Sequence, residues 1–505
     1  MLHLAAEVLV QIFRAATFEH IHLPIGEDVP SQPHVVLTIS HVCRTWRDII
    51  LNVPSLWDVI HTGCSAQLVS ACLERSHSIP LRVRIEVPGF DAIPWFLDLV
   101  PSFTHRIRDM CIGRADDCAD RIASVESIVR VLNKPAPKLE RLTIDVRPPN
   151  LFTMPIIFSS STPSLKVISL NQVRWNEGNT FRGLTHLTLA TVERCICAHL
   201  YETLIHSPGL ERLELDGVTP QYPDTVSDIR IVLSRLRHLE IQNIYWSSLC
   251  TFLSHIDIPS RCTFICPYLE SPVNLPDRML MSCLPEDISL IRPLHRSTKL
   301  AVGLPNALLL CGGNEDSGSA FEVVSGWPLV ASSGHFFEQT LLSLIHHFPL
   351  DDVQELWLGP LPFRAASTHS SLETWRRTFQ GIPRLRTLVL LPGIHVSDVL
   401  NAFHPDDPCQ WALLPDLMHV RIVYNRFGSV LPWSALEGFL EARRDAGFPL
   451  QSLRIQDLFG RMNKLSGCVD GILQHETGKN FGPKFELTGW NFSLYNNILE
   501  HEAAY

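Results

Sequence analysis

Apolar side chains in residues 4–18 recur at the spacing of a helix. At 100° per residue they cover about half of the helix circumference. The apolar positions are Leu4, Val8, Leu9, Ile12, Phe13 and Ala16, and the polar positions between them are Glu7, Gln11 and Arg14. A stripe this wide exposes more apolar surface than one neighbouring helix covers. The segment therefore needs a further partner, which is either the rest of the chain or a second protein.

A proline-rich stretch, residues 19–33, interrupts the helical pattern and predicts a loop. A second helix is predicted after it, and Pro54 ends that helix. Its apolar face carries Val42, Cys43, Trp46, Ile49 and Ile50. A helical unit of about 60 residues buries too little surface to be robust alone.

Beyond a predicted helix at 65–77 and an alternating strand at 81–87, one short pattern repeats along the chain. It reads apolar-x-x-apolar-x-apolar and returns at intervals of 19 to 33 residues, apart from one long gap. Its first positions are Ile107, Leu139, Leu165, Leu184, Leu210 and Leu236, and then Val353, Leu385, Leu417 and Leu450. We expect each copy to form a strand whose apolar residues face the core.

Helix-like stretches lie between many of these strands. They are residues 123–132, 197–207, 337–347, 371–380 and 433–445. Strand, loop and helix repeated at this period are typical of a solenoid, so the predicted fold class is α/β. Residues 245–350 are less regular, and strand-like runs there predict degenerate or paired strands. The runs are 263–266, 300–304, 307–311 and 320–324.

Composition narrows the function classes. The chain has 505 residues, of which 46% are hydrophobic and 19% charged, with 42 basic and 52 acidic side chains. It is too apolar for a disordered protein and not basic enough for a nucleic-acid binder. No apolar run is long enough to predict a membrane helix, and the first residues lack the basic leader of a signal peptide. Fourteen scattered cysteines predict reduced thiols in the cytoplasm, the nucleus or both.

Three blocks near the start resemble the F-box. They are Leu4-x-x-Glu7-x-Leu9-x-x-Ile12-Phe13, then Val42-Cys43-Arg44-x-Trp46-Arg47, then Pro54-x-Leu56-Trp57. The first block departs from the family, because Ala5 stands where Pro is usual. The resemblance covers roughly residues 2–58 and implies a docking module for a Skp-family adaptor held by a cullin. The implied adaptor-binding and module-core residues are Leu4, Leu9, Ile12, Phe13, Val42, Cys43, Trp46, Leu56 and Trp57.

The repeats resemble irregular leucine-rich repeats of the kind fused to F-boxes in fungi. They lack the Asn or Cys that usually follows the last Leu. In the first series of repeats that position is occupied by Arg147, Val173, Val192, Val218 and Ile244, and in the second series only Asn425 fits. The turns must therefore be stabilised in another way. The predicted domains are an F-box at 1–60, a solenoid at 61–480 that is irregular around 245–350, and a C-terminal strand or tail at 481–505.

In such a solenoid the middle residue of each strand points away from the helices. This set is neutral, then acidic, aromatic and basic along the chain. We expect partner-binding residues among Glu214, Glu240, Trp357, Arg421 and Arg454, although an ordinary mixed solvated surface has the same composition.

Other chemical motifs are weak. Cys195, Cys197, His199 and His206 lack the paired spacing of a zinc site. Cys262 and Cys266 share one face of a predicted strand and read as core. The glycine-rich run 312–318 has no Lys-Ser/Thr ending and predicts a hairpin loop or insert. No hydrolase motif is recognisable, so we expect no cofactor, no metal and no catalytic residue.

The resemblances together imply the substrate-recognition subunit of a Skp–cullin–F-box ubiquitin ligase. Its partners are the adaptor, the cullin through it and an unidentified protein substrate, with no nucleic acid and no membrane. One alternative is a non-degradative leucine-rich-repeat scaffold. A second alternative is a hydrolase-like enzyme hidden in residues 245–350.

Overall fold

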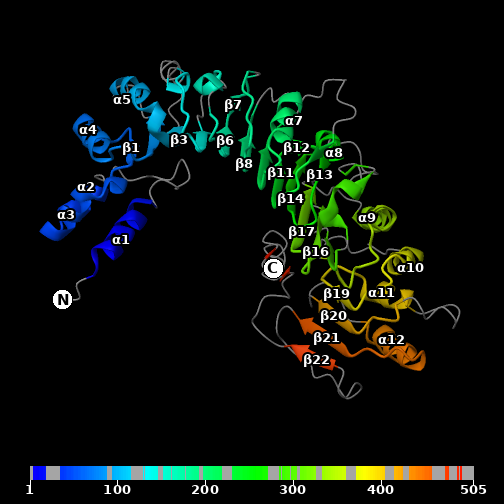
Figure 1. Ribbon diagram of the computed structural model, residues 1–505. Helices are drawn as coiled ribbons and strands as arrows, with labels where there is room; N and C mark the ends of the chain where they lie inside the picture. The colour runs from blue at the N-terminus through cyan, green and yellow to red at the C-terminus, as the bar shows by residue number, and fades with distance from the viewer. Residues whose placement is uncertain are drawn as a thin grey trace. The chain divides into compact units, whose positions relative to one another are not determined.

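The chain is a mixed α/β structure whose largest sheets are mostly parallel (Figure 1). Its computed structural model divides into two compact units, Met1–Ser227 and Asp228–Tyr505. The residues that it describes are 4–18, 35–87, 94–114, 129, 131–145, 152–160, 162–176, 178–192, 197–218, 230–270, 284–285, 287–295, 297–303, 308–325, 333–359, 371–403, 414–424, 432–457, 473–476, 486–487 and 490–491.

Unit 1 begins with the predicted helix, α1 (Ala6–Phe18), which is confirmed. The second predicted helix is not continuous. It is split into α2 (Val35–Ser40) and α3 (Arg44–Asn52) by a turn at residues 41–43. Cys43 is extended and its Sγ accepts a hydrogen bond from the backbone N–H of Trp46, 3.5 Å away. The thiol thus acts as the N-cap of a new helix, a role that helical periodicity alone does not reveal. The predicted loop at 19–33 lies outside the described residues.

The main sheet of unit 1 is built from parallel strands that follow one another in chain order. The strands are β1 (Val59–His61), β2 (Leu81–Val87), β3 (Ile107–Arg114), β4 (Arg141–Asp145), β6 (Val167–Asn171), β8 (His186–Ala190) and β9 (Arg212–Asp216). Two short strands form a separate parallel pair. They are β5 (Phe152–Thr153), which follows β4 along the chain, and β7 (Val173–Arg174), which follows β6. The remaining described α-helices of the unit are α4 (Ala66–Arg75), α5 (Pro94–Leu99) and α7 (Cys197–Ile205).

The repeated apolar positions of unit 1 form straight ladders across this sheet. Leu142 is in register with Ile168, Ile168 with Leu187, and Leu187 with Leu213. All four side chains are completely buried. The sequence prediction that these positions face the core is therefore confirmed, and each strand buries its aliphatic side chains against those of its neighbours.

The turns after these strands show what replaces the missing Asn. Gln172, Thr191 and Gly217 each adopt a left-handed backbone, with φ of 53°, 49° and 59°. The backbone N–H of Gln172 donates to the carbonyl oxygen of Ala190. In the next turn the backbone N–H of Thr191 donates to the carbonyl oxygen of Asp216. The next residues, which are Val173, Val192 and Val218, are buried. Lateral backbone bonds and buried valines thus stabilise these turns without an amide side chain.

The sheet of unit 2 contains parallel segments on both sides of an antiparallel insertion. Its strand order is β11 (His238–Gln242) and β12 (Ile244–Tyr245), β14 (Thr263–Glu270), β17 (Ser319–Ser325), β16 (Leu308–Asn314), β15 (Lys299–Gly303), β18 (Glu355–Leu358), β19 (Thr387–Leu390), β20 (His419–Tyr424), β21 (Ser452–Asp457) and β22 (Leu473–Glu476). Two short pairs complete the described strands, β10 (Ile231–Val232) with β13 (Ile256–Asp257) and β23 (Glu486–Leu487) with β24 (Trp490–Asn491).

The antiparallel insertion explains why the repeat pattern stops between 245 and 350. β15, β16 and β17 form two successive hairpins, so the prediction of paired strands is confirmed. The glycine-rich run 312–318 is the end of the β16–β17 hairpin, as expected. Gly312 is required there, because a Cβ at this position would lie 2.6 Å from the carbonyl oxygen of Lys299.

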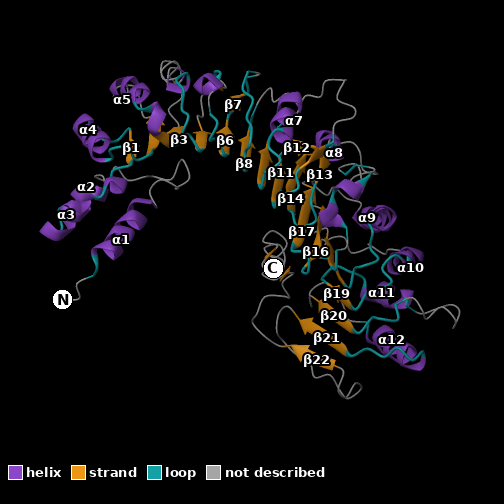
Figure 2. Ribbon diagram, viewed as in Figure 1, coloured by secondary structure: helices purple, strands orange, loops and turns teal. Residues whose placement is uncertain are grey.

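Helices lie along one side of the unit 2 strands (Figure 2). They are α8 (Trp246–Ser254), α9 (Ser333–His347), α10 (Leu372–Gln380), α11 (Val396–Ala402) and α12 (Trp433–Asp445). The sequence predicted α9, α10 and α12, and it predicted α4 and α7 in unit 1. It missed α8, the short α11 and α5 of unit 1. The predicted helix at 123–132 falls almost entirely outside the described residues.

A buried arginine fixes α12 to the turn before β20. The guanidinium of Arg443 donates to the carbonyl oxygens of Leu414, Leu417 and Phe448. Burial lowers the pKa of Arg443 to about 10. Three backbone acceptors therefore compensate a cation that would otherwise be costly to bury.

Among the described helices, none is long and apolar enough to cross a membrane.

Substituting Asn for one of these buried valines should destabilise this fold. Val218→Asn buries an amide where a valine now packs, so we expect a loss of about 2–4 kcal/mol in the free energy of unfolding. Val42→Asn, at an exposed turn, is the matched control and should change it by less than about 0.5 kcal/mol. Denaturant unfolding measures both, and equal effects would contradict this account of the turns.

Candidate functional site

The apolar stripe of α1 divides into two halves with different surroundings. Leu9 and Phe13 are buried, and Phe13 is only 2% exposed. Val8 and Ile12, on the adjacent face, are 45% and 48% exposed, and Leu4 just before the helix is 53% exposed. Leu4, Val8 and Ile12 follow one another at intervals of four residues and so share one face of the helix. We call these three residues the exposed stripe.

The buried half of α1 packs on the aromatic residues of the next helices. The rings of Phe13 and Trp46 meet edge to face with centroids 4.9 Å apart. Leu56 and Trp57 are buried as well, and the Trp57 indole N–H donates to the carbonyl oxygen of Ile50 at 2.9 Å. These residues form the core of the helical segment, which sequence reasoning could not separate from its surface.

The other predicted docking residues lie at the surface. Val42 is 58% exposed and Cys43 is exposed beside it, both in the turn between α2 and α3. Trp46 is half-buried against Phe13. The docking residues predicted from the sequence did not include Val8. Its position midway between Leu4 and Ile12 indicates that it shares their face of the helix.

Polar contacts hold the helical segment against the first strands of unit 1. Arg14 donates to the hydroxyl of Ser55 through both Nε and Nη2, at 3.1 and 2.6 Å. Asp58 and Arg82 form a buried two-point ion pair, with N–O distances of 3.0 and 2.7 Å. The Arg75 guanidinium lies 4.4 Å from the centre of the Trp57 ring. The exposed stripe is therefore presented by a segment anchored to the sheet.

The expected partner-binding residue of unit 1 is Glu214 on β9. Its carboxylate accepts a hydrogen bond from the Thr188 hydroxyl at 2.8 Å, and it pairs with the Arg212 guanidinium. Thr143, Ser169 and Thr188 are in register with it and are all half-buried. An arginine beside it largely compensates the acidic charge predicted for this strand.

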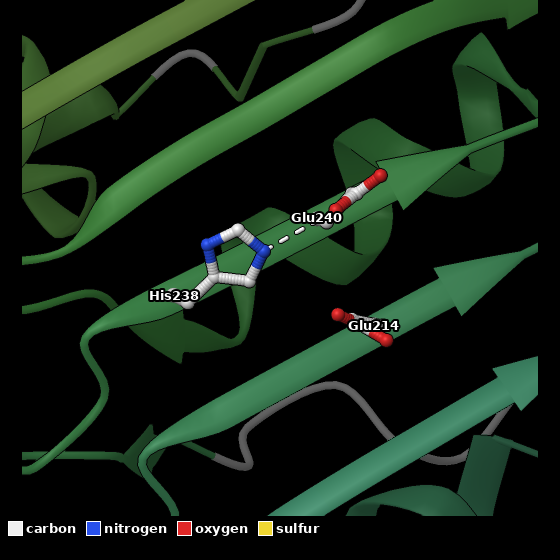
Figure 3. A group of neighbouring side chains, drawn as sticks. All are labelled: Glu214, His238 and Glu240. Carbon is white, nitrogen blue, oxygen red and sulfur yellow. Dashed lines mark hydrogen bonds and ion pairs between the residues drawn. The ribbon is translucent and has the colours of Figure 1, made fainter. Parts of the chain in front are cut away.

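Glu240 is the first expected partner-binding residue of unit 2. It lies two residues from His238 on β11, so the two side chains share a face of the strand (Figure 3). The His238 Nε2 lies 3.2 Å from a carboxylate oxygen of Glu240. The pair places an imidazole nitrogen and a carboxylate oxygen side by side on one face of β11.

Trp357, Arg421 and Arg454 do share one face of the unit 2 sheet. The register places Trp357 opposite Val389, Val389 opposite Arg421, and Arg421 opposite Arg454. Arg421 donates to the Gln456 side chain at 2.7 Å and is half-buried, as is Arg454. Trp357 is only 4% exposed, and its indole N–H donates to Glu355 at 2.6 Å. The structure therefore places Trp357 inside the protein rather than on an open binding surface.

Several cysteines were considered for metal binding or for nucleophilic catalysis. Cys262, just before β14, and Cys266, within β14, are both buried, as expected for core residues. Burial raises the pKa of Cys262 to about 12 and that of Cys311 well above its ordinary value. Because nucleophilic cysteines need a lowered pKa, neither thiol suits the hydrolase alternative. Cys195 and the Cys197 side chain lie outside the described residues.

Comparison with known proteins adds no identification, because no family model matches the chain and a search of curated proteins finds no match.

Adjacent residues of α1 should respond very differently to the same change. Phe13→Ala removes a buried ring and should cost about 3–5 kcal/mol. Ile12→Ala removes an exposed side chain and should cost less than about 1 kcal/mol. Hydrogen exchange of residues 6–18, read by mass spectrometry, reports this local stability. A larger effect at Ile12 than at Phe13 would contradict the division of the stripe.

Proposed function

We propose that this chain is the substrate-recognition subunit of a Skp–cullin–F-box ubiquitin ligase. The observation that carries the proposal is the exposed stripe, which lies in the segment whose sequence resembles the F-box. Val42, from the second matching block, is exposed as well. The exposed aliphatic side chains of residues 2–58 are therefore Leu4, Val8, Ile12, Val42 and Leu51, whereas Leu9, Phe13, Leu56 and Trp57 are buried and hold that segment together.

The spacing of the exposed stripe suits a helix that docks in an apolar groove. Such helices present anchors at intervals of three or four residues. Burying an aliphatic side chain of this size contributes about 1.5–3 kcal/mol, so the stripe alone offers several kcal/mol to an interface. Large exposed apolar patches are uncommon on proteins that act alone. An adaptor that covers Leu4, Val8 and Ile12 would supply the missing contacts.

The strand–helix repeats would select the substrate in this proposal. Their in-register strands resemble a leucine-rich-repeat solenoid, in which successive copies create a long surface for a protein partner. The chain itself then performs no chemistry. It contributes proximity, because a substrate held beside the catalytic partner reacts at a high effective concentration.

A non-degradative repeat scaffold is the second candidate. It is supported by the same strand–helix repeats and differs only in what the exposed stripe recruits. The presence of the cullin in the assembled complex separates the two candidates.

Charged substitutions in the exposed stripe and at Val42 should abolish adaptor binding. Ile12→Asp combined with Val42→Asp places carboxylates where apolar contacts are required, so capture of a purified Skp-family adaptor should fall at least about 100-fold. The matched control is Ile205→Asp, at an equally exposed isoleucine of α7. It should leave capture unchanged.

Cys43 gives a second readout of the same interface. Its exposed thiol should react with iodoacetamide in the free chain and be protected when the adaptor is bound. Undiminished capture by the double variant, together with an unprotected Cys43, would refute docking through this surface.

The ligase proposal also predicts which proteins accompany the chain in cells. Purification of the intact chain should recover adaptor, cullin and one or more substrates. The Ile12→Asp, Val42→Asp chain should lose adaptor and cullin together but retain the substrates, because the repeats are intact. Recovery of the adaptor without any cullin would favour the scaffold instead.

A further inference from the structure

Two exposed arginines of unit 2 converge on one buried carboxylate. The Nη2 atom of Arg230 lies 3.0 Å from Oδ2 of Asp257, and the Nη2 atom of Arg292 lies 2.8 Å from the same oxygen. The Asp257 side chain is only 6% exposed, whereas the two arginine side chains are 60% and 53% exposed. We call Arg230 and Arg292 the arginine pair.

Three neighbouring segments of the chain place these groups on one face. β10 runs parallel to β13, and a single bridge joins the residue after β13 to the residue before Arg292. The isoleucines that these pairings bring together are all buried, and they are Ile231, Ile256, Ile258 and Ile291. Because side chains alternate along extended segments, Arg230, Asp257 and Arg292 point away from these isoleucines.

Solvent reaches this face beside the carboxylate. Val232 is in register with Asp257 on the neighbouring strand, and it is 55% exposed. Side chains in register on adjacent strands point to the same side of a sheet. A ligand that approaches from solvent can therefore contact Val232 and the arginine pair together.

The second arginine is more than Asp257 requires. A buried carboxylate is costly to keep charged without an opposite charge nearby, and one guanidinium supplies that charge. A second guanidinium held at the same oxygen adds repulsion between two like charges. The arrangement thus concentrates positive charge on an exposed face, where a further anion would compensate it.

The arginine pair also keeps most of its hydrogen-bonding capacity. Each guanidinium carries five N–H donors in a planar fork. Within the described part of the chain, each of the two donates one hydrogen bond, to Asp257. Since that bond fixes one edge of each fork, the remaining donors are held in place before a ligand arrives.

The number of donors favours a phosphate group over a carboxylate. Guanidinium forks bind phosphate oxygens in pairs, and such charge-assisted bonds are about twice as strong as neutral ones. A phosphate monoester offers three acceptor oxygens and a charge of about −1.5 to −2 at pH 7. A carboxylate offers two oxygens and one charge, so it would use less of what two forks present.

We propose that Arg230 and Arg292, held in place by Asp257, form a binding site for the phosphate group of a ligand. Asp257 is a positioning residue in this site. The phosphate group is either free or part of an ester, and the exposed Val232 offers an apolar contact to the organic part of an ester. The proposal does not depend on the ubiquitin-ligase function.

Two further titratable groups border the site. Hydrogen bonds from Ser289 are the main cause that lowers the pKa of Asp287, and the nearby charges of Arg230 and His295 lower it further. The Nε2 atom of His295 lies 2.9 Å from the carbonyl oxygen of Ile288. The exposed Asp287 carboxylate therefore lies close enough to Arg230 to oppose a bound anion.

The first experiment measures phosphate binding to the full chain by calorimetry at constant ionic strength. Its probes are inorganic phosphate and a short peptide with one phosphoserine among neutral residues. Arg230→Gln or Arg292→Gln should weaken binding at least about tenfold, because charge-assisted hydrogen bonds are lost. Arg384→Gln removes the same charge from a one-to-one ion pair with Asp352, so this matched control should bind as the unmodified chain does.

The two probes distinguish the source of the phosphate. Tighter binding of the peptide supports a site for an ester, and equal or tighter binding of inorganic phosphate supports a site for free phosphate. The proposal is overturned if the unmodified chain binds neither probe. It is also overturned if both arginine variants bind as well as the unmodified chain, or if Arg384→Gln weakens binding equally.

A second measurement separates binding from a structural role of the arginine pair. Each single variant leaves Asp257 paired with the remaining arginine, so its thermal unfolding midpoint without phosphate should stay close to that of the unmodified chain. A large fall in the midpoint of both variants would show that Asp257 requires both arginines, which contradicts the surplus of charge.

A third variant should change the affinity in the opposite direction. Asp287→Asn keeps a side-chain oxygen that can accept from the Ser289 N–H, but it removes a negative charge near Arg230. Binding of the tighter probe should therefore become roughly threefold stronger. Weaker binding by this variant would count against a phosphate site beside Arg230.

Discussion

The structure depends on aliphatic side chains that stack in register across parallel strands. Each strand contributes residues such as Leu187 or Leu388, which pack between the equivalent residues of the strands on either side. A single strand with its helix buries too little surface to be stable, so each copy needs its neighbours. This constraint fixes the spacing of the apolar triads. It does not constrain the residues between them, and in the proposed function those are the positions that would select a partner.

The first residues of the chain obey a different constraint. Their helices bury Phe13, Leu56 and Trp57 and are anchored to the sheet through Asp58 and Arg82. α1 carries more apolar side chains than this small core buries. An apolar surface on an anchored segment is already ordered, so a partner that binds it need not order it first. The proposed adaptor interaction uses this surplus.

Much of the fold was predictable because burial imposes a period on the sequence. The triads beginning at Ile107 through Leu450 predicted strands whose apolar residues are indeed buried, and α7, α9, α10 and α12 followed from helical periodicity. The break between α2 and α3 was not predictable in this way. It arises because the Cys43 thiol accepts from the Trp46 N–H and starts a new helix, and side-chain capping has no periodic signature. The conformation of the turns was not predictable either. Residues such as Gln172 and Thr191 complete them with a left-handed backbone, and the absence of Asn from the sequence does not indicate this.

The sequence by itself determined the strand–helix repeat, the resemblance of the first residues to a docking module, and the set of residues that could form its interface. Only the tertiary structure decided which of them are exposed, since Ile12 and Phe13 are equally apolar neighbours in the sequence. It also decided that Trp357 is buried, whereas the alternation of the strand predicted an open face. The physical reason is the same in both cases. Local periodicity fixes the face of an element on which a side chain lies, but solvent exposure depends on segments far away in the sequence that do or do not pack against that face.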